Sequence, residues 1–316
     1  MATTDVARPA RESERKRAGT EDAPEREPKA AAPAASATAT PATEAPPPAP
    51  VAGPDGAPPA PSTARWRPPV AVAAVVLGML AGIGVSIALV LVGEGTIFEG
   101  VGLLAADAVL VAIVVAFARR GAERLTPATF SIRRTPFWPA LGWTLVTYFF
   151  VMAVQALWVA FVAGPEVGGG GGAGAGGSAS TAVIVLVVVG VAITAPIAEE
   201  IAFRGYLFPA LTRWRGPWIA ALITALLFGA AHVAVYPPAF LPALAFFGFG
   251  ACMLLWFTGS LLPSIGLHAL NNGIVVGFAV GWSWLVPAIA LGAPILAILL
   301  LLPFARERAP RAPVTT

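Results

Sequence analysis

Residues 181–208 read TAVIVLVVVGVAITAPIAEEIAFRGYLF and place two adjacent carboxylates and an arginine inside an apolar run. The 18 residues ahead of Glu199 carry no charge, which approaches the roughly 20 apolar residues that a helix needs to cross a bilayer. A charged side chain at the centre of such a helix costs about 2.5–3.5 kcal/mol on insertion scales, so it is rare and usually functional. Pro196 removes one helical hydrogen bond just before the acids, a kink that is tolerated where freed backbone groups line a polar cavity.

The composition of the chain is that of a membrane protein. Of its 316 residues, 57% are hydrophobic and 12% are charged, against about 45–50% and about 25% in soluble domains. Half of the charged residues, 18 of 37, fall in the first 67 positions. The basic residues form no face or groove, so nucleic acid is not an expected partner. The single cysteine, Cys252, excludes an internal disulfide and a cysteine-built zinc site.

Hydrophobic runs predict an all-α, polytopic membrane protein of about eight transmembrane helices. We expect the spans near residues 69–92, 100–118, 138–163, 181–203, 217–235, 239–259, 261–281 and 284–303. The domain organisation follows from them: a disordered Ala/Pro-rich cytoplasmic tail (1–66), front transmembrane helices (67–163), a Gly-rich linker (164–180), a catalytic transmembrane core (181–303) and a short basic C-terminal tail (304–316).

The distribution of arginine predicts the orientation. If eight spans alternate, every arginine that flanks a span falls on one side, which is the cytoplasmic side by the positive-inside rule. The opposite loops hold Glu94, Glu99 and Glu166 and no arginine. We therefore expect a multi-pass protein of the plasma membrane with both termini in the cytoplasm. The flanking arginines are Arg65, Arg67, Arg119, Arg120, Arg124, Arg133, Arg134, Arg213, Arg215, Arg306, Arg308 and Arg311.

Further polar residues lie in the apolar spans of the back half. LLFGAAHVAVYPP (226–238) places His232 one turn after Phe228, and PSIGLHALNNG (263–273) places His268 and Asn272 on one helix face. The front half offers only Asp107, which is either an interfacial residue or a minor polar contact, and we favour the interface. Each residue has a structural alternative, because a histidine can bind a backbone carbonyl, an arginine can reach the headgroups and an asparagine can join two helices.

Two chemistries fit these residues. A carboxylate beside an imidazole can deprotonate a water molecule, while a second imidazole and a carboxamide donate to the developing oxyanion. Two histidines and one carboxylate can instead hold a hydrolytic zinc ion. If a metal is bound, its ligands would be Glu199, His232 and His268. The residue pattern alone leaves both chemistries open.

Three motifs in order on successive spans resemble one known family. Glu199-Glu200-x-x-x-Arg204, Phe228-x-x-x-His232 and His268-x-x-x-Asn272 look like the motifs of the CPBP family, the CAAX proteases and bacteriocin-processing enzymes also called Abi. The resemblance covers roughly residues 180–280. The tail and the first three spans match no family that we can name.

The resemblance implies an intramembrane endopeptidase, whose eukaryotic relatives remove the last three residues of prenylated CAAX proteins. By analogy Glu199 is the general base, His232 binds and activates water, and His268 with Asn272 lines the oxyanion site, while Glu200 and Arg204 organise the motif. The family has been described both as metal-dependent and as metal-free. We favour no cofactor, with Zn²⁺ as the alternative, and expect a bacterial member to cleave a peptide or a membrane protein, or to act in bacteriocin maturation or immunity.

Two other classes of function use the same polar residues. A transporter or channel also contains intramembrane acids and histidines, but no inverted repeat is apparent. A catalytically silent membrane scaffold would not need its two histidines. One geometric conflict stands against the protease: straight spans leave Glu199 and His232 on the order of 22 Å apart in depth. Either span four extends to about Leu211, which puts the glutamates nearer mid-depth, or span five is tilted and starts deeper; we expect the former.

Overall fold

The computed structural model describes residues 65–93, 97–164, 180–280 and 283–309. Nearly all of the predicted N-terminal tail and Gly-rich linker, and the last seven residues, lie outside these ranges. Within them the chain is helical with no strand, which confirms the all-α class. The α-helices are α1 (Pro68–Val92), α2 (Ile97–Ala118), α3 (Phe137–Trp158), α4 (Thr181–Val189), α5 (Ala195–Glu199), α6 (Phe208–Ala230), α7 (Leu241–Thr258), α8 (Leu261–Ala279) and α9 (Val286–Leu301).

The helices between Thr181 and Ala230 form one segment of 50 residues. Two π-helical stretches, η5 (Gly190–Thr194) and η6 (Glu200–Leu207), interrupt its α-helical hydrogen bonding. Among the described residues, seven helices are long and apolar enough to cross a membrane, and this segment is one of them. The protein is therefore a multi-pass membrane protein, and predicted spans four and five are parts of one long segment.

A turn at Gly216 folds this segment back on itself. Gly216 has φ 75° and ψ 172° in the middle of α6, a backbone region that is essentially restricted to glycine. The rings of Phe203 and Phe228, which lie on opposite sides of this turn along the chain, are 5.2 Å apart. Helix therefore continues past Leu211 to the turn, as expected, and the predicted end of span four at residue 203 is too early.

Replacing Gly216 tests the turn. Gly216→Ala is expected to lower the free energy of unfolding by about 1–3 kcal/mol because alanine must adopt a strained backbone conformation. No atom lies within 4 Å of a Cβ at this position, so the backbone alone causes the loss. Gly84→Ala in α1 also places its Cβ in open space, and this helical control should not lose stability. Unfolding in detergent, followed by tryptophan fluorescence, measures both; an equal stability of the two variants would contradict the strained turn.

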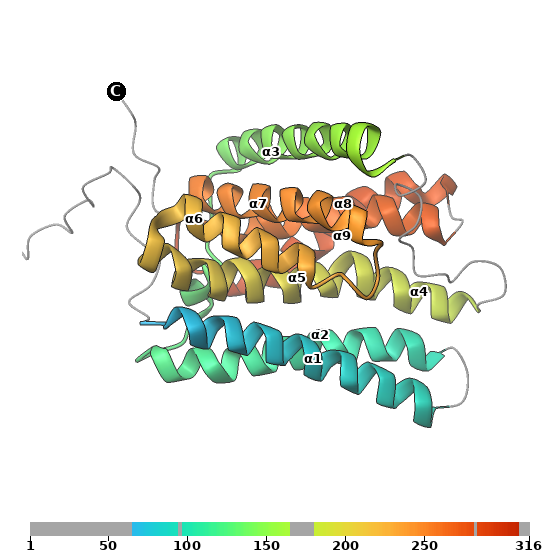
Figure 1. Cartoon of the computed structure of the whole chain (residues 1–316), viewed down its shortest axis with the longest axis horizontal. Helices are drawn as coiled ribbons and strands as arrows, with labels where there is room; N and C mark the ends of the chain where they lie inside the picture. The colour runs from blue at the N-terminus through green and yellow to red at the C-terminus, as the bar shows by residue number, and fades with distance from the viewer. Residues whose placement is uncertain (1–64, 94–96, 165–179, 281–282, 310–316) are drawn as a thin grey trace, which may run out of the picture. The chain divides into compact units, whose positions relative to one another are not determined.

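The helices pack as neighbouring pairs (Figure 1). α1 packs against α2, α6 against α7, and α8 against α9, while α3 packs against α7 on the side of α7 away from α1 and α2. α2 also contacts α4, α5 and both π-helical stretches. Large apolar side chains on the outside are exposed, as Leu80 (63%) and Phe149 (66%) show. Such a surface suits a bilayer and not water.

The loop between α2 and α3 is tied to both ends of the described chain. Trp66, at the end of the predicted tail, is buried, donates from Nε1 to Ala118 O at 3.0 Å and packs against Tyr206. In the predicted C-terminal tail, Glu307 pairs with Arg133 at 3.7 Å. Burial lowers the pKa of Arg133, an effect that the charge of Glu307 partly opposes.

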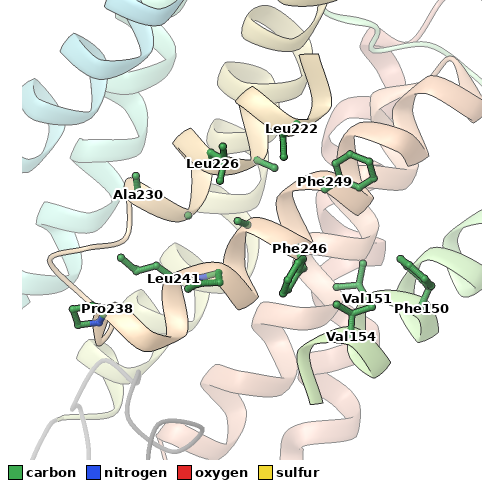
Figure 2. Close-up of a pocket in the computed structure, with 14 residues that line it drawn as sticks. Phe150, Val151, Val154, Leu222, Leu226, Ala230, Pro238, Leu241, Phe246 and Phe249 are labelled. Carbon is green, nitrogen blue, oxygen red and sulfur yellow. The ribbon is translucent and has the colours of Figure 1, made fainter. Parts of the chain in front are cut away.

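An apolar pocket of about 740 Å³ lies between α3, α6 and α7 (Figure 2). Every residue that lines it is apolar, so the pocket offers no group for acid–base chemistry. Gly229 and Ala230 form part of its wall and directly precede the turn that carries His232. The polar residues singled out in the sequence lie in a separate cluster.

Candidate active site

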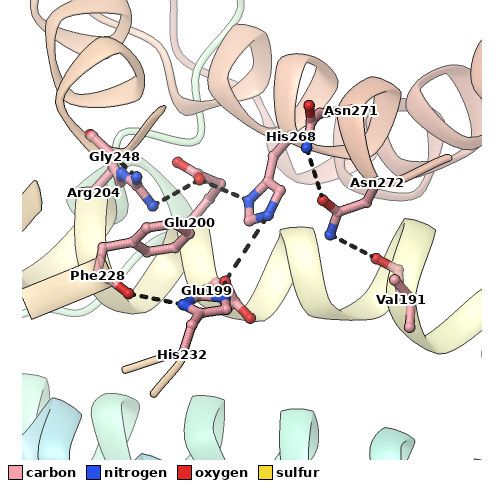
Figure 3. A network of polar contacts seen from close by, with 10 residues as sticks. All are labelled: Val191, Glu199, Glu200, Arg204, Phe228, His232, Gly248, His268, Asn271 and Asn272. Atoms are coloured by element: carbon pink, nitrogen blue, oxygen red, sulfur yellow. Dashed lines mark hydrogen bonds and ion pairs between the residues drawn. The ribbon is translucent and has the colours of Figure 1, made fainter. Parts of the chain in front are cut away.

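Glu200 and Arg204 form the buried centre of the polar cluster (Figure 3). Arg204 Nη1 donates to Glu200 Oε1 at 2.9 Å, and both side chains are fully buried in η6. Arg204 Nη2 also donates to the Gly248 carbonyl of α7 at 3.2 Å. A buried charge is tolerated when it is paired and hydrogen-bonded. The predicted pairing of these two residues is present in the structure.

Gly248 allows α7 to approach closely enough to accept this hydrogen bond. A Cβ at this position would lie 3.1 Å from Ala225 Cα and 3.3 Å from Phe228 Cβ, which is tighter than ordinary van der Waals contact. α6 and α7 would have to separate to admit one. The glycine therefore keeps the backbone of α7 within reach of Arg204.

His268 binds the same carboxylate from α8. Its Nδ1 lies 3.0 Å from Glu200 Oε1, and its side chain is 4% exposed. Because that carboxylate also accepts from Arg204, we assign the His268 Nδ1 as the donor. This contact fixes the ring so that Nε2 points toward Glu199, at 3.9 Å from its Oε2.

The turn at Gly216 brings His232 to the other side of Glu199. His232 Nε2 lies 4.0 Å from Glu199 Oε2. Its Nδ1 lies 2.8 Å from the Phe228 carbonyl, which can only accept, so Nδ1 is the donor and Nε2 carries the lone pair of the neutral ring. The predicted conflict in depth between Glu199 and His232 is thus resolved, because the helix that carries Glu199 continues to Gly216 and the chain turns back there.

Glu200 accepts a hydrogen bond from Arg204, whereas Glu199 Oε2 accepts none from the described residues. This Glu199 oxygen is buried without a hydrogen-bond partner among the described residues, although 18% of the side chain is exposed. Oε2 and His232 Nε2 are two acceptors that face each other at 4.0 Å. A small hydrogen-bond donor such as water fits between two acceptors at this separation.

Aromatic rings enclose the cluster on one side. The Phe228 ring lies 4.8 Å from that of His232 and 5.8 Å from that of His268, and the Arg204 guanidinium sits 4.3 Å from its centroid. Phe247 of α7 adds a contact to His268 at 5.2 Å. These apolar walls lower the local dielectric and strengthen the charge interactions inside.

Asn272 lies one turn after His268, but its side chain is engaged elsewhere. Its Nδ2 donates to the Val191 carbonyl at 3.0 Å, and Asn271 donates to its Oδ1 at 3.3 Å. In η5 the Ala195 N–H binds the carbonyl five residues earlier; the next such donor would be Pro196, which has no N–H. The carbonyl left free is that of Val191, and Asn272 satisfies it, joining α8 to the kinked helix.

Asp107 makes the polar contact that the sequence left open as an alternative to an interfacial position. Its Oδ2 accepts a hydrogen bond of 2.6 Å from Thr194 Oγ1 in η5. It also interacts electrostatically with Glu199 and His268. The available signal was that an ionisable residue inside a span is a functional candidate by default. The front helices thus contribute to the surroundings of the site.

The donor set matches zinc in type but not in spacing. Zinc bonds of about 2.0–2.2 Å in a tetrahedral arrangement put ligand atoms about 3.3–3.5 Å apart. Glu199 Oε2 lies 4.0 Å from one histidine and 3.9 Å from the other. No group of three or more His, Cys, Asp and Glu side chains in the described part of the chain forms a candidate metal site. These residues do not fit the ion as they stand.

One comparison with known proteins finds a match in the back half of the chain. Residues 181–274 match the family model described as Type II CAAX prenyl endopeptidase Rce1-like. This segment is similar to that family. The match confirms the family resemblance and supports, at the level of the family, a CAAX-type intramembrane protease. Neither the curated proteins nor the solved structures contain a match to the chain.

The Rce1-like segment includes all six residues that the sequence singled out as catalytic. The structure links five of them by direct contacts: Glu199, Glu200, Arg204, His232 and His268. The side chain of the sixth, Asn272, makes its hydrogen bonds to Asn271 and Val191 and to none of the other five. The catalytic roles that the resemblance implies stay predictions.

Proposed function

We propose that the protein is an intramembrane endopeptidase of the CAAX-protease type in which Glu199 activates a water molecule. The observation that carries the proposal is that Glu199 Oε2 has no hydrogen-bond partner among the described residues and lies within 4.0 Å of two imidazole Nε2 atoms. A carboxylate in an apolar, enclosed site that can accept a proton from water is suited to general base catalysis. His232 Nε2 would accept the other hydrogen of that water and orient it.

In the proposed reaction the water oxygen attacks the carbonyl carbon of the scissile bond while Glu199 takes a proton. The carbonyl oxygen becomes an oxyanion. Glu199 then gives its proton to the leaving nitrogen as the C–N bond breaks, which releases a carboxylic acid and an amine and returns Glu199 to its carboxylate form. His268 in its protonated form would donate from Nε2 to the oxyanion, held by Glu200 through Nδ1.

The charge balance of the site supports this assignment. Arg204 and Glu200 neutralise each other, which leaves the charge of Glu199 alone in the cluster. A protonated His268 between the two carboxylates would bring the net charge of these groups to zero, the arrangement that a low-dielectric site favours. During the reaction the negative charge moves from Glu199 to the oxyanion, still beside the same imidazole.

The substrate that we propose is a membrane-associated peptide or protein, and the lipid bilayer is the setting of the reaction. We also propose a plasma-membrane location with both termini cytoplasmic, on the distribution of arginine. The purified protein, reconstituted in vesicles, should be offered a farnesylated peptide ending in a CAAX sequence, its unprenylated counterpart and a library of apolar lipopeptides. Cleavage found by mass spectrometry is the expected result; intact peptides throughout would argue for transport or scaffolding.

Chelation tests the choice between water activation by Glu199 and a metal centre. We expect cleavage to be unchanged by EDTA and by 1,10-phenanthroline, because the proposed reaction uses side chains and water alone. A zinc endopeptidase treated in the same vesicles is the control for effective chelation. Cleavage that is lost on chelation and restored by Zn²⁺ would contradict the metal-free proposal and make Glu199, His232 and His268 the candidate ligands.

A further inference from the structure

The turn between α6 and α7 extends a column of aromatic rings outward from the site. Tyr236 lies four residues after His232, and its backbone N–H donates to the His232 carbonyl at 3.0 Å. The ring centroids are 4.8 Å apart from Phe228 to His232, 6.0 Å from His232 to Tyr236 and 5.3 Å from Tyr236 to Phe240. Tyr236 is therefore the next aromatic ring after His232, the proposed water-binding histidine.

The column runs from a buried ring to partly exposed ones. Phe228 is 1% exposed and the His232 side chain 18% exposed, while Tyr236 is half-buried in the turn. The Tyr236 hydroxyl makes no hydrogen bond to any described residue and is not sealed from its surroundings. A phenol that is held by stacking on Phe240 but has an unused O–H group is a donor available to a ligand.

Burial and a nearby negative charge favour the protonated form of the Tyr236 phenol. Burial raises the pKa of the phenol above its ordinary value, and the negative charge of Glu199 raises it further. The Tyr236 ring lies 6.0 Å from the ring of His232, whose Nε2 lies 4.0 Å from Glu199 Oε2, so the phenol is one residue removed from the proposed base. The amide of Asn272, by contrast, already donates to Val191 O. The site therefore has a place for a further oxyanion donor.

We infer that Tyr236 is a further catalytic residue whose O–H donates a hydrogen bond to the carbonyl oxygen of the scissile peptide bond. This inference rests on the proposed peptidase function. The donor strengthens its bond as the carbonyl oxygen gains negative charge, so it stabilises the transition state more than the bound substrate. No proton is transferred from the phenol in this role.

Tyr236→Phe tests the inference because it removes only the hydroxyl and keeps the ring that stacks on Phe240. With a peptide that the wild type cleaves, the variant is expected to lose about 10²–10³-fold in kcat, the usual effect of removing one oxyanion donor. KM should stay within about twofold of the wild-type value, and the melting temperature should stay within a few degrees of it. Tyr148→Phe in α3 removes a hydroxyl from another half-buried tyrosine and should leave kcat unchanged.

Two results would overturn the assignment. Wild-type kcat in Tyr236→Phe would show that its hydroxyl has no catalytic role, and a raised KM with unchanged kcat would show that it binds substrate and transition state equally. In either case the proposed function survives if Glu199→Gln still abolishes cleavage of that peptide. Cleavage that persists in Glu199→Gln would instead remove the proposed function, and this inference with it.

Discussion

Glu199→Gln is expected to lower kcat/KM by about 10²–10⁴-fold, the range that general base catalysis contributes. Glutamine has the shape of glutamate but cannot take the proton of a bound water. The fold should survive, because Glu199 Oε2 has no hydrogen-bond partner in the described part of the chain that the change would break. Initial rates of peptide cleavage at several substrate concentrations measure the effect.

The matched control for this variant is Glu99→Gln. Glu99 lies in the first turn of α2 and is exposed, so the same chemical change there should leave cleavage at the wild-type rate. Equal melting temperatures of the two variants separate loss of chemistry from loss of folding. Substantial cleavage by folded Glu199→Gln would exclude this residue as the base.

Arg204→Met is expected to destabilise the protein by about 3–5 kcal/mol, because it leaves the Glu200 carboxylate charged and buried without its ion pair. Arg204 and Glu200 are both fully buried and their charged atoms lie 2.9 Å apart. The free energy of unfolding in detergent, followed through the nine tryptophans, measures the loss. Arg67→Met makes the same change at an exposed arginine before α1 and should cost no more than about 0.5 kcal/mol.

A double-mutant cycle distinguishes the lost ion pair from lost packing. Glu200→Gln combined with Arg204→Met leaves no lone charge in the interior, so the double variant should be more stable than the sum of the two single losses predicts. Strict additivity of the two losses would show that the pair is not coupled in the folded protein. Activity should stay low in the double variant, since His268 loses the carboxylate that orients it.

The elements that could be predicted from the sequence are those fixed by local properties. Apolar runs defined the helices, and the four-residue spacing of Glu200 and Arg204 predicted their pairing. The boundary at residue 203 was wrong because Arg204 resembles the polar end of a span. In the structure that arginine is neutralised from within the same helix and by Gly248 of α7, so the helix continues to the turn at Gly216.

The features that could not be predicted depend on contacts between distant segments. Asp107 and Thr194 are 87 residues apart in the sequence, as Asn272 and Val191 are 81 apart, and no local pattern links either pair. The direction in which each histidine points its Nε2 likewise depends on partners of Nδ1, which are Glu200 for His268 and the Phe228 carbonyl for His232. Sequence motifs name the side chains, whereas these contacts set the chemistry that the side chains can perform.

The most direct test of a glutamate-activated, metal-free peptidase is one measurement of cleavage under four conditions. Wild type and Glu199→Gln, each purified and reconstituted, are compared with and without chelator on one peptide that the wild type cleaves. We expect the wild type to cleave at equal rates in both conditions and the variant to show no cleavage above background. Wild-type rates from Glu199→Gln, or loss of wild-type cleavage on chelation with recovery on adding Zn²⁺, would contradict it.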